Sequence, residues 1–248
     1  MKGGPEDQRA FTLAELLILA GLLALLAAMA IPVLASTADR TRRARCQNNL
    51  RQIAMGVTIY AGNYHGRLFS ARAGSVQVAL NATDGAAAAT VGLSFQTNGV
   101  WTCPNRLGLP VYDAPFAQWK IGYQYFGGIA TWANPAGNFP SRSPTNLTTA
   151  RAYWTIAADA VLKVDGQWGG NVQDVIYTNL PQHHADDSTT PQGGNQAFAD
   201  GSVQWVQAQR MFFLSSWSVS ARQAYWYQDT RDFDPALRSM ISNLRFQP

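Results

Sequence analysis

Five histidine and aspartate side chains in the C-terminal third have the residue types that bind metal ions. They are His183, His184, Asp186, Asp187 and Asp200. Imidazole nitrogens and carboxylate oxygens bind divalent cations, so His184, Asp186, Asp187 and Asp200 are candidate ligands. The stretch contains no established ligand spacing such as HExxH or DxDxDG. Asp200-Gly201 between two apolar runs is also typical of a hairpin turn, and the sequence leaves both interpretations open.

Nucleophilic catalysis has less support than metal binding. The chain has no GxSxG motif, and neither of its two cysteines, Cys46 and Cys103, has a neighbouring histidine in sequence. We therefore expect that the protein is not an enzyme. In an exported chain, an even pair of cysteines favours a disulfide, which would close a loop of about 57 residues and contribute about 4 kcal/mol. Two buried free thiols are the alternative.

A further acidic side chain, Glu15, lies at the start of the most apolar stretch of the chain. No charged residue occurs from Leu16 to Ala35. About 20 residues form a helix of about 30 Å, which is enough to cross the hydrocarbon core of a bilayer. An ionised carboxylate is costly in such surroundings unless it is paired, so Glu15 is a candidate functional residue.

The residues around Glu15, RAFTLAEL over positions 9–16, resemble the class III signal of type IV prepilins and type II secretion pseudopilins. The resemblance implies that residues 1–10 are a leader, that a prepilin peptidase cuts between Ala10 and Phe11, and that the new amine of Phe11 is methylated. It also implies that Glu15 acts in filament assembly and that Pro32 kinks the helix. Ala10 stands where the family usually has Gly.

Two other targeting interpretations are open for the same stretch. In an ordinary secretory signal, Lys2 and Arg9 would be the basic region, and cleavage would follow the small residues at 28–30 or 33–35. In a plain membrane anchor, Glu15 would lie at the lipid headgroups. A mature chain that begins at Phe11 would indicate the prepilin signal, whereas Ile31 or Ser36 would indicate secretion.

The helix is predicted to continue past the apolar stretch. Apolar residues recur there at alternating spacings of four and three, namely Cys46, Leu50, Ile53, Val57, Tyr60 and Tyr64. This spacing places them in one stripe of an amphipathic helix. We expect a transmembrane and assembly half over residues 11–35, a kink near Pro32 from its missing hydrogen bond, and an amphipathic half over residues 36–66.

Further stretches extend the resemblance to a branch of pilin-like proteins named for an H-x(9)-DG element. ARCQNNLRQI at 44–53 and YAGNYHGR at 60–67 resemble the helix and the following turn of that branch. Cys103-Pro104 and QAFADGSV at 196–203 match its Cys-Pro and FADG stretches, whereas His184 is displaced by an insertion. Some pseudopilins bind calcium in a loop of the sheet domain, so calcium or another divalent metal is a candidate cofactor here.

Residues 67–248 are predicted to form one extracytoplasmic, β-rich domain. Charged residues make up 14% of the chain, and strand patterns occur at 99–103, 121–128, 153–161 and 175–177. Asp234-Pro235 predicts a short helix through Leu244. The expected fold class is α+β, with a long N-terminal helix packed on an antiparallel sheet in a pilin-like fold.

Function follows from the resemblance and from the charge. Arginines make up much of the positive charge and cluster beside the apolar stretch, which favours lipid headgroups or a protein partner over nucleic acid. They are Arg40, Arg42, Arg43, Arg45 and Arg51. The resemblance implies a structural subunit of a type IV pilus-like or type II secretion pseudopilus filament. Its partners would be a prepilin peptidase, copies of itself or other pilins, the inner membrane and an assembly platform.

The alternative is a membrane-anchored envelope enzyme or a glycan-binding module. Such a protein would use the His183–Asp200 region or the aromatic residues of the C-terminal tail. The tail is rich in Phe, Trp and Tyr, among them Trp217. Aromatic side chains that pack on the sheet would explain the same composition.

Overall fold

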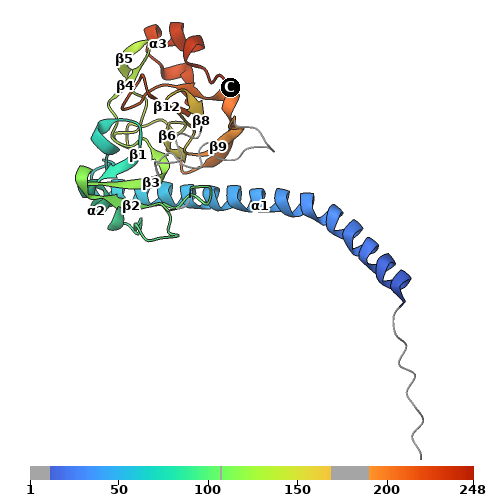
Figure 1. The fold of residues 1–248 in the computed structure, drawn as a ribbon. Coiled ribbons are helices and arrows are strands. Elements are labelled where there is room, and N and C mark those ends of the chain that lie inside the picture. Colours follow the sequence, from blue (N-terminus) through green and yellow to red (C-terminus); the bar gives the residue numbers. More distant parts are fainter. Residues whose placement is uncertain (1–11, 107, 169–189) are drawn as a thin grey trace, which may run out of the picture. The chain divides into compact units, whose positions relative to one another are not determined.

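The computed structural model describes residues 12–106, 108–168 and 190–248 (Figure 1). The chain divides into two compact units, one ending at Thr41 and one running from Arg42 to Pro248. We call them the helical unit and the sheet unit. Helix α1 (Leu13–Asn63) contributes residues to both, so the sheet unit includes the C-terminal part of this helix.

The expected transmembrane half is corrected by the structure. Helix α1 begins at Leu13, and its side chains are described without interruption only over residues 13–26, a stretch of 14 residues. Among the described residues, no helix is long and apolar enough to cross a membrane. The predicted pilin-like fold class with a transmembrane half is therefore wrong, and the fold is α+β with a β-rich core.

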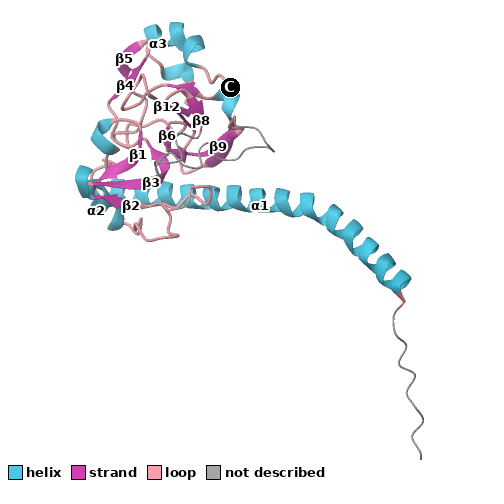
Figure 2. Ribbon diagram, in the orientation of Figure 1, coloured by secondary structure: helices cyan, strands magenta, loops and turns pink. Residues whose placement is uncertain are grey.

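The main sheet is antiparallel and has the strand order β1-β3-β6-β9-β10, with β2 paired to β3 as well. Its strands are among those drawn in magenta in Figure 2. Its strands are β1 (Gln77–Asn81), β2 (Val111–Asp113), β3 (Gln118–Tyr125), β6 (Thr155–Asp159), β9 (Gly193–Phe198) and β10 (Val203–Gln207). Strands distant in sequence are therefore neighbours, and β6 lies between β3 and β9. The central strands β6 and β9 are buried along their whole length.

The rest of the sheet unit forms a second sheet, a hairpin and short helices. The second sheet has the order β11-β12-β7-β8, and β4 and β5 pair with each other. The bounds are β4 (Thr131–Asn134), β5 (Gly137–Pro140), β7 (Leu162–Val164), β8 (Gln167–Trp168), β11 (Phe212–Phe213), β12 (Arg222–Trp226), α2 (Ala82–Ala89) and α3 (Pro235–Met240). Short 3-10 helices are η1 (Arg72–Gly74), η2 (Ala114–Phe116), η3 (Ala208–Arg210), η4 (Thr230–Asp232) and η5 (Ile241–Leu244). The described residues thus form more than the single sheet that the sequence predicts.

The predicted helix stripe supplies one side of the core. Cys46, Leu50, Ile53 and Val57 have no exposed surface and belong to one apolar cluster with residues of the main sheet. Residues of the stripe near the end of the helix are less buried, and Tyr64, just after it, is 47% exposed. The sequence therefore predicts correctly which face of the helix packs.

Helix α1 ends at Asn63, as its glycines and asparagine predict. His65 and Gly66 follow with positive φ angles of 55° and 83°. The Gly66 amide donates a hydrogen bond to the Ala61 carbonyl, with an N···O distance of 2.7 Å, and so closes the last turn. His65 is thus a turn residue here.

The other predicted elements have mixed outcomes. Strands β3 and β6 confirm the patterns at 121–128 and 153–161, and α3 starts at Pro235 with the Asp234 side chain as its cap. The predicted strand at 99–103 is wrong, because this stretch forms turns closed by bonds such as Thr102 N to Gly99 O at 3.0 Å. The pattern at 175–177 lies outside the described residues.

Candidate functional site

The predicted metal site is described only at Asp200. His183, His184, Asp186 and Asp187 lie outside the described residues. Asp200 lies in the turn that joins β9 to β10, and its carboxylate accepts a hydrogen bond from the Ser202 amide at 2.9 Å. Gly201 follows with φ 82°. Asp200 therefore has the contacts of a turn-forming residue.

The processing residues cannot be placed, whereas the start of the helix can. Ala10 and Phe11 lie outside the described residues, and for Pro32 the structure describes a helical backbone but no side chain. The expected kink at Pro32 is therefore not described. Glu15 is described, and it lies in the first turn of α1.

Glu15 and Thr12 form a capping box at the start of helix α1. The Glu15 carboxylate accepts hydrogen bonds from the Thr12 backbone amide at 2.9 Å and from the Thr12 hydroxyl at 2.8 Å. In return, the Glu15 amide donates to the Thr12 hydroxyl at 3.3 Å. These reciprocal bonds satisfy amide groups that a helix start leaves without partners. Glu15 therefore has a local structural role that the sequence interpretation did not include, although the Thr-x-x-Glu spacing indicates it.

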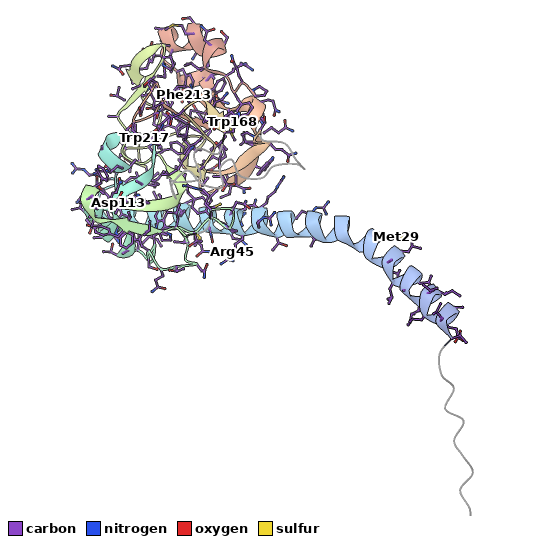
Figure 3. All side chains as sticks on the ribbon, viewed as in Figure 1. Met29, Arg45, Asp113, Trp168, Phe213 and Trp217 are labelled. Atoms are coloured by element: carbon purple, nitrogen blue, oxygen red, sulfur yellow. The ribbon has the colours of Figure 1, made fainter. Side chains whose placement is uncertain are left out.

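The apolar side chains that follow Glu15 are exposed to solvent. Each of ten large apolar residues between positions 13 and 29 is 50–77% exposed. They are Leu13, Leu16, Leu17, Ile18, Leu19, Leu22, Leu23, Leu25, Leu26 and Met29. Met29 is labelled in Figure 3. Because a soluble protein rarely leaves so many neighbouring apolar side chains in water, this surface is a candidate contact site.

The arginine cluster has one member held against the main sheet. The Arg43 guanidinium lies 4.4 Å from the ring centre of Trp205, and its Nη2 donates to the Gln192 side chain at 2.9 Å. Arg40, Arg42, Arg45 and Arg51 are exposed. The exposed members leave positive charge accessible to a partner.

Two cysteines and one aspartate meet where helix α1 packs on the main sheet. The Cys46 and Cys103 sulfur atoms are 3.3 Å apart and hydrogen-bonded, and both residues are fully buried. Neither forms a disulfide in this structure. A carboxylate oxygen of Asp159, on β6, lies within 4.8 Å of both sulfur atoms. Among the described residues, these three form the one group of histidine, cysteine and acidic side chains compact enough to hold a metal ion.

Polar side chains hold this group in place. Asn49, one turn after Cys46, donates to the Thr102 carbonyl at 2.9 Å and to the Tyr123 hydroxyl at 3.0 Å. The Asp159 carboxylate accepts from the Asn195 backbone amide at 2.8 Å and from its side-chain amide at 2.9 Å. The group therefore connects the helix, the turn at Cys103 and strands β3, β6 and β9.

The electrostatics of the group favour the neutral form of the Cys46 thiol. The hydrogen bond to Cys103, burial and the charge of Asp159 all raise the pKa of the Cys46 thiol far above its ordinary value. Burial likewise raises the pKa of the neighbouring Tyr123 hydroxyl. Since a thiolate is the nucleophilic form of cysteine, this environment makes Cys46 a poor nucleophile.

The aromatic residues of the tail mostly pack inside the sheet unit. Phe213 and Tyr225 are 3% and 6% exposed, and Trp226 is 1% exposed. Trp217 and Phe213 are both labelled in Figure 3, and Trp217 is partly buried against the core. An open cavity of about 320 Å³ lies beside Tyr225, Lys163 and Arg245. A sugar-binding platform needs exposed rings, and the rings of Phe213, Tyr225 and Trp226 are covered.

The sequence interpretation missed three residues of these sites. Thr12 was detectable from the capping-box spacing. Asp159 and Asn195 carry no local signal, because only the pairing of β6 with β3 and β9 brings Asp159 near the cysteines and Asn195 near Asp159. Comparison of this chain with protein-family models, curated proteins and solved structures found no match.

Proposed function

We propose that this chain is a pilin-like structural subunit of a type IV pilus-like or type II secretion pseudopilus filament. A prepilin peptidase removes the leader between Ala10 and Phe11, and helix α1 then packs against the helices of other subunits. The observation that carries the proposal is the set of ten exposed apolar side chains between positions 13 and 29. The resemblance of residues 9–16 to a prepilin signal supports other pilin subunits as the partners that bind this surface.

Covering the apolar surface would contribute substantially to association. Full burial of a Leu, Ile or Met side chain contributes about 1.5–3 kcal/mol, so covering the exposed half of each contributes about 1 kcal/mol. Ten such side chains together supply about 10 kcal/mol before the entropic costs of association are subtracted. This gain is of the same order as the cost of association, about 4–15 kcal/mol, which the contact must offset.

Copies of the same chain, or of related pilins, are the proposed occupants of the surface. A helix that offers apolar side chains all round can contact several neighbours at once. Contacts that repeat between different patches without closing a ring produce a filament. In this arrangement the Glu15 carboxylate of one subunit pairs with the new Phe11 amine of the next. Subunits shifted along the filament axis would leave both charges unpaired, so the pair disfavours such shifts.

The remaining partners follow from this assembly route. The subunit is held at the inner membrane before assembly, with the sheet unit on its outer side. The exposed arginines 40, 42, 45 and 51 would meet lipid headgroups or the assembly platform. No catalytic step and no nucleic acid is part of the proposal.

The N-terminus of the mature protein tests the proposal. The full chain is produced with and without a prepilin peptidase, and the N-terminal peptide is identified by mass spectrometry. We expect a chain that starts at Phe11 and carries one added methyl group, formed only with the active peptidase. Ala10→Leu serves as the matched control, because a bulky residue before the cut should block processing. A chain that keeps residues 1–10, or that begins at Ile31 or Ser36, would contradict the proposal.

A further inference from the structure

The buried cysteine pair carries an inference that goes beyond filament assembly and does not depend on it. Cys46 lies on helix α1, and Cys103 lies in the turn before Pro104. Their sulfur atoms are 3.3 Å apart, whereas a disulfide bond is about 2.05 Å long. Each sulfur would have to move by about 0.6 Å to close that gap. The fold therefore brings the two thiols almost into bonding position.

We propose that Cys46 and Cys103 are joined by a disulfide while the sheet unit folds, and that the folded unit then locks the pair in the redox state in which it was buried. In an oxidising compartment the result is a covalent link between helix α1 and the Cys103 turn. In a reducing medium the result is a buried dithiol that later oxidant does not reach.

The closing reaction balances with a small disulfide such as oxidised glutathione as the oxidant. In the unfolded chain, the thiolate of one cysteine attacks this disulfide, forms a mixed disulfide and releases one glutathione thiolate. As the helix docks, the second cysteine loses its proton to solvent and attacks the mixed disulfide, which releases the second glutathione. The two cysteines are oxidised by two electrons, and oxidised glutathione is reduced to two thiols.

Burial explains why the state is locked after folding. Both cysteines have no exposed surface, so neither a thiol reagent nor an oxidant can approach them without opening of the helix–sheet contact. The same burial protects a disulfide from reductants, because the attacking thiolate must reach a sulfur atom.

A structural zinc ion is a less suitable explanation of the same three residues. Two thiolates on tetrahedral zinc would lie about 3.8 Å apart, farther than the observed 3.3 Å. Asp159 is the third available ligand, and its Oδ2 atom already accepts two hydrogen bonds from Asn195. Among the described residues the group offers three ligands, one fewer than a closed structural zinc site requires.

Refolding the full chain in two media tests the proposal. The chain is unfolded in denaturant with reductant and then refolded either with oxidised glutathione or with reductant. Each folded product is next transferred to the opposite medium without denaturant. The thiols are counted by maleimide labelling and mass spectrometry, before and after unfolding, and bound zinc is measured in parallel.

We expect each product to keep its redox state. The chain refolded with oxidant should show no reactive thiol even after native incubation with reductant. The chain refolded in reductant should react with maleimide at least about 100-fold more slowly when folded than when unfolded. Met55→Cys is the matched control, because Met55 is 59% exposed on the same helix, and its thiol should label rapidly in the folded chain.

Several outcomes would overturn the proposal. One is a pair that stays reduced when the chain refolds with oxidant. Another is exchange between the two states in the folded chain at the rate seen in denaturant. A third is one bound zinc ion per chain that prevents oxidation. Cys46→Ser alone can destabilise the core. The double variant Cys46→Ala with Cys103→Ala is therefore the control, and any maleimide signal that is absent from it comes from these two thiols.

Discussion

The carboxylate of Glu15 has one observed and one proposed role, and two substitutions separate them. It caps helix α1 through Thr12, and it is proposed to pair with the Phe11 amine of a neighbouring subunit. Glu15→Gln keeps an oxygen that can accept the capping bonds but removes the charge, since glutamine also occupies this position in capping boxes. Thr12→Ala keeps the charge but removes the hydroxyl that makes two of the three capping bonds.

The expected effects of the two substitutions on helix stability and on filament yield differ in size. Loss of the Thr12 hydroxyl should cost about 1 kcal/mol of helix stability and fray the first turn. The exposed apolar surface begins at Leu13 and extends to Met29, several turns beyond that end, so the fraying leaves most of the contact surface intact. In contrast, Glu15→Gln leaves a buried amine in the filament without its partner, and we expect filament yield to fall by at least about tenfold.

The assay is the amount of sedimentable filament formed by each variant in cells that carry the peptidase and the assembly system. Processing at Phe11 is checked by mass spectrometry, so that a cleavage defect is not mistaken for an assembly defect. We expect Thr12→Ala to assemble at close to the wild-type level and Glu15→Gln to fail. Equal yields for Glu15→Gln and wild type would refute the charge-pairing argument, and a loss confined to Thr12→Ala would show that Glu15 acts as a cap.

Two further predictions concern the sheet unit. Leu50→Ala should lower the free energy of unfolding by about 2–5 kcal/mol, because Leu50 is fully buried, whereas Met55→Ala on the exposed face should change it by less than about 0.5 kcal/mol in denaturant titrations. The hydrogen bond from Gln118 and the ion pair with Lys120 lower the pKa of Asp113 in the folded chain. Its stabilising contribution should therefore be present above the unfolded pKa of about 3.9 and be lost as pH falls through the folded value, so Asp113→Asn should weaken the acid dependence of stability. A pH dependence of stability below pH 4 that Asp113→Asn leaves unchanged would contradict this assignment.

Local patterns predicted the elements whose contacts are local. The stripe from Cys46 to Val57 predicted the buried helix face, because helical spacing alone decides which side chains share a face. Asp200-Gly201 predicted the β9–β10 turn, since few residues adopt the positive φ found at Gly201. Asp234-Pro235 predicted the start of α3, because the Asp234 side chain caps the helix and proline fits its first turn.

Elements that depend on distant contacts were not predictable in the same way. Trp101 and Cys103 suggested a strand, yet they are buried through side-chain packing, with the Trp101 indole donating to the Leu93 carbonyl at 2.9 Å. Strand propensity reflects burial as much as backbone pairing, so the pattern was ambiguous. The approach of Asp159 to the cysteines depends on the order of strands in the sheet, which no local pattern encodes. The transmembrane half was predicted from a charge-free run of residues, whereas among the residues that the structure describes no membrane-spanning helix is found.

The exposed apolar side chains of helix α1 are proposed to bind other subunits. Electron microscopy of the sedimentable fraction from peptidase-containing cells, combined with mass spectrometry of its protein, tests this most directly. We expect filaments composed of the chain from Phe11 onward, and their loss when Leu16, Leu19 and Leu23 are replaced by Ser. A processed chain that stays monomeric in the same cells, or filaments that form equally well with those three substitutions, would contradict the claim.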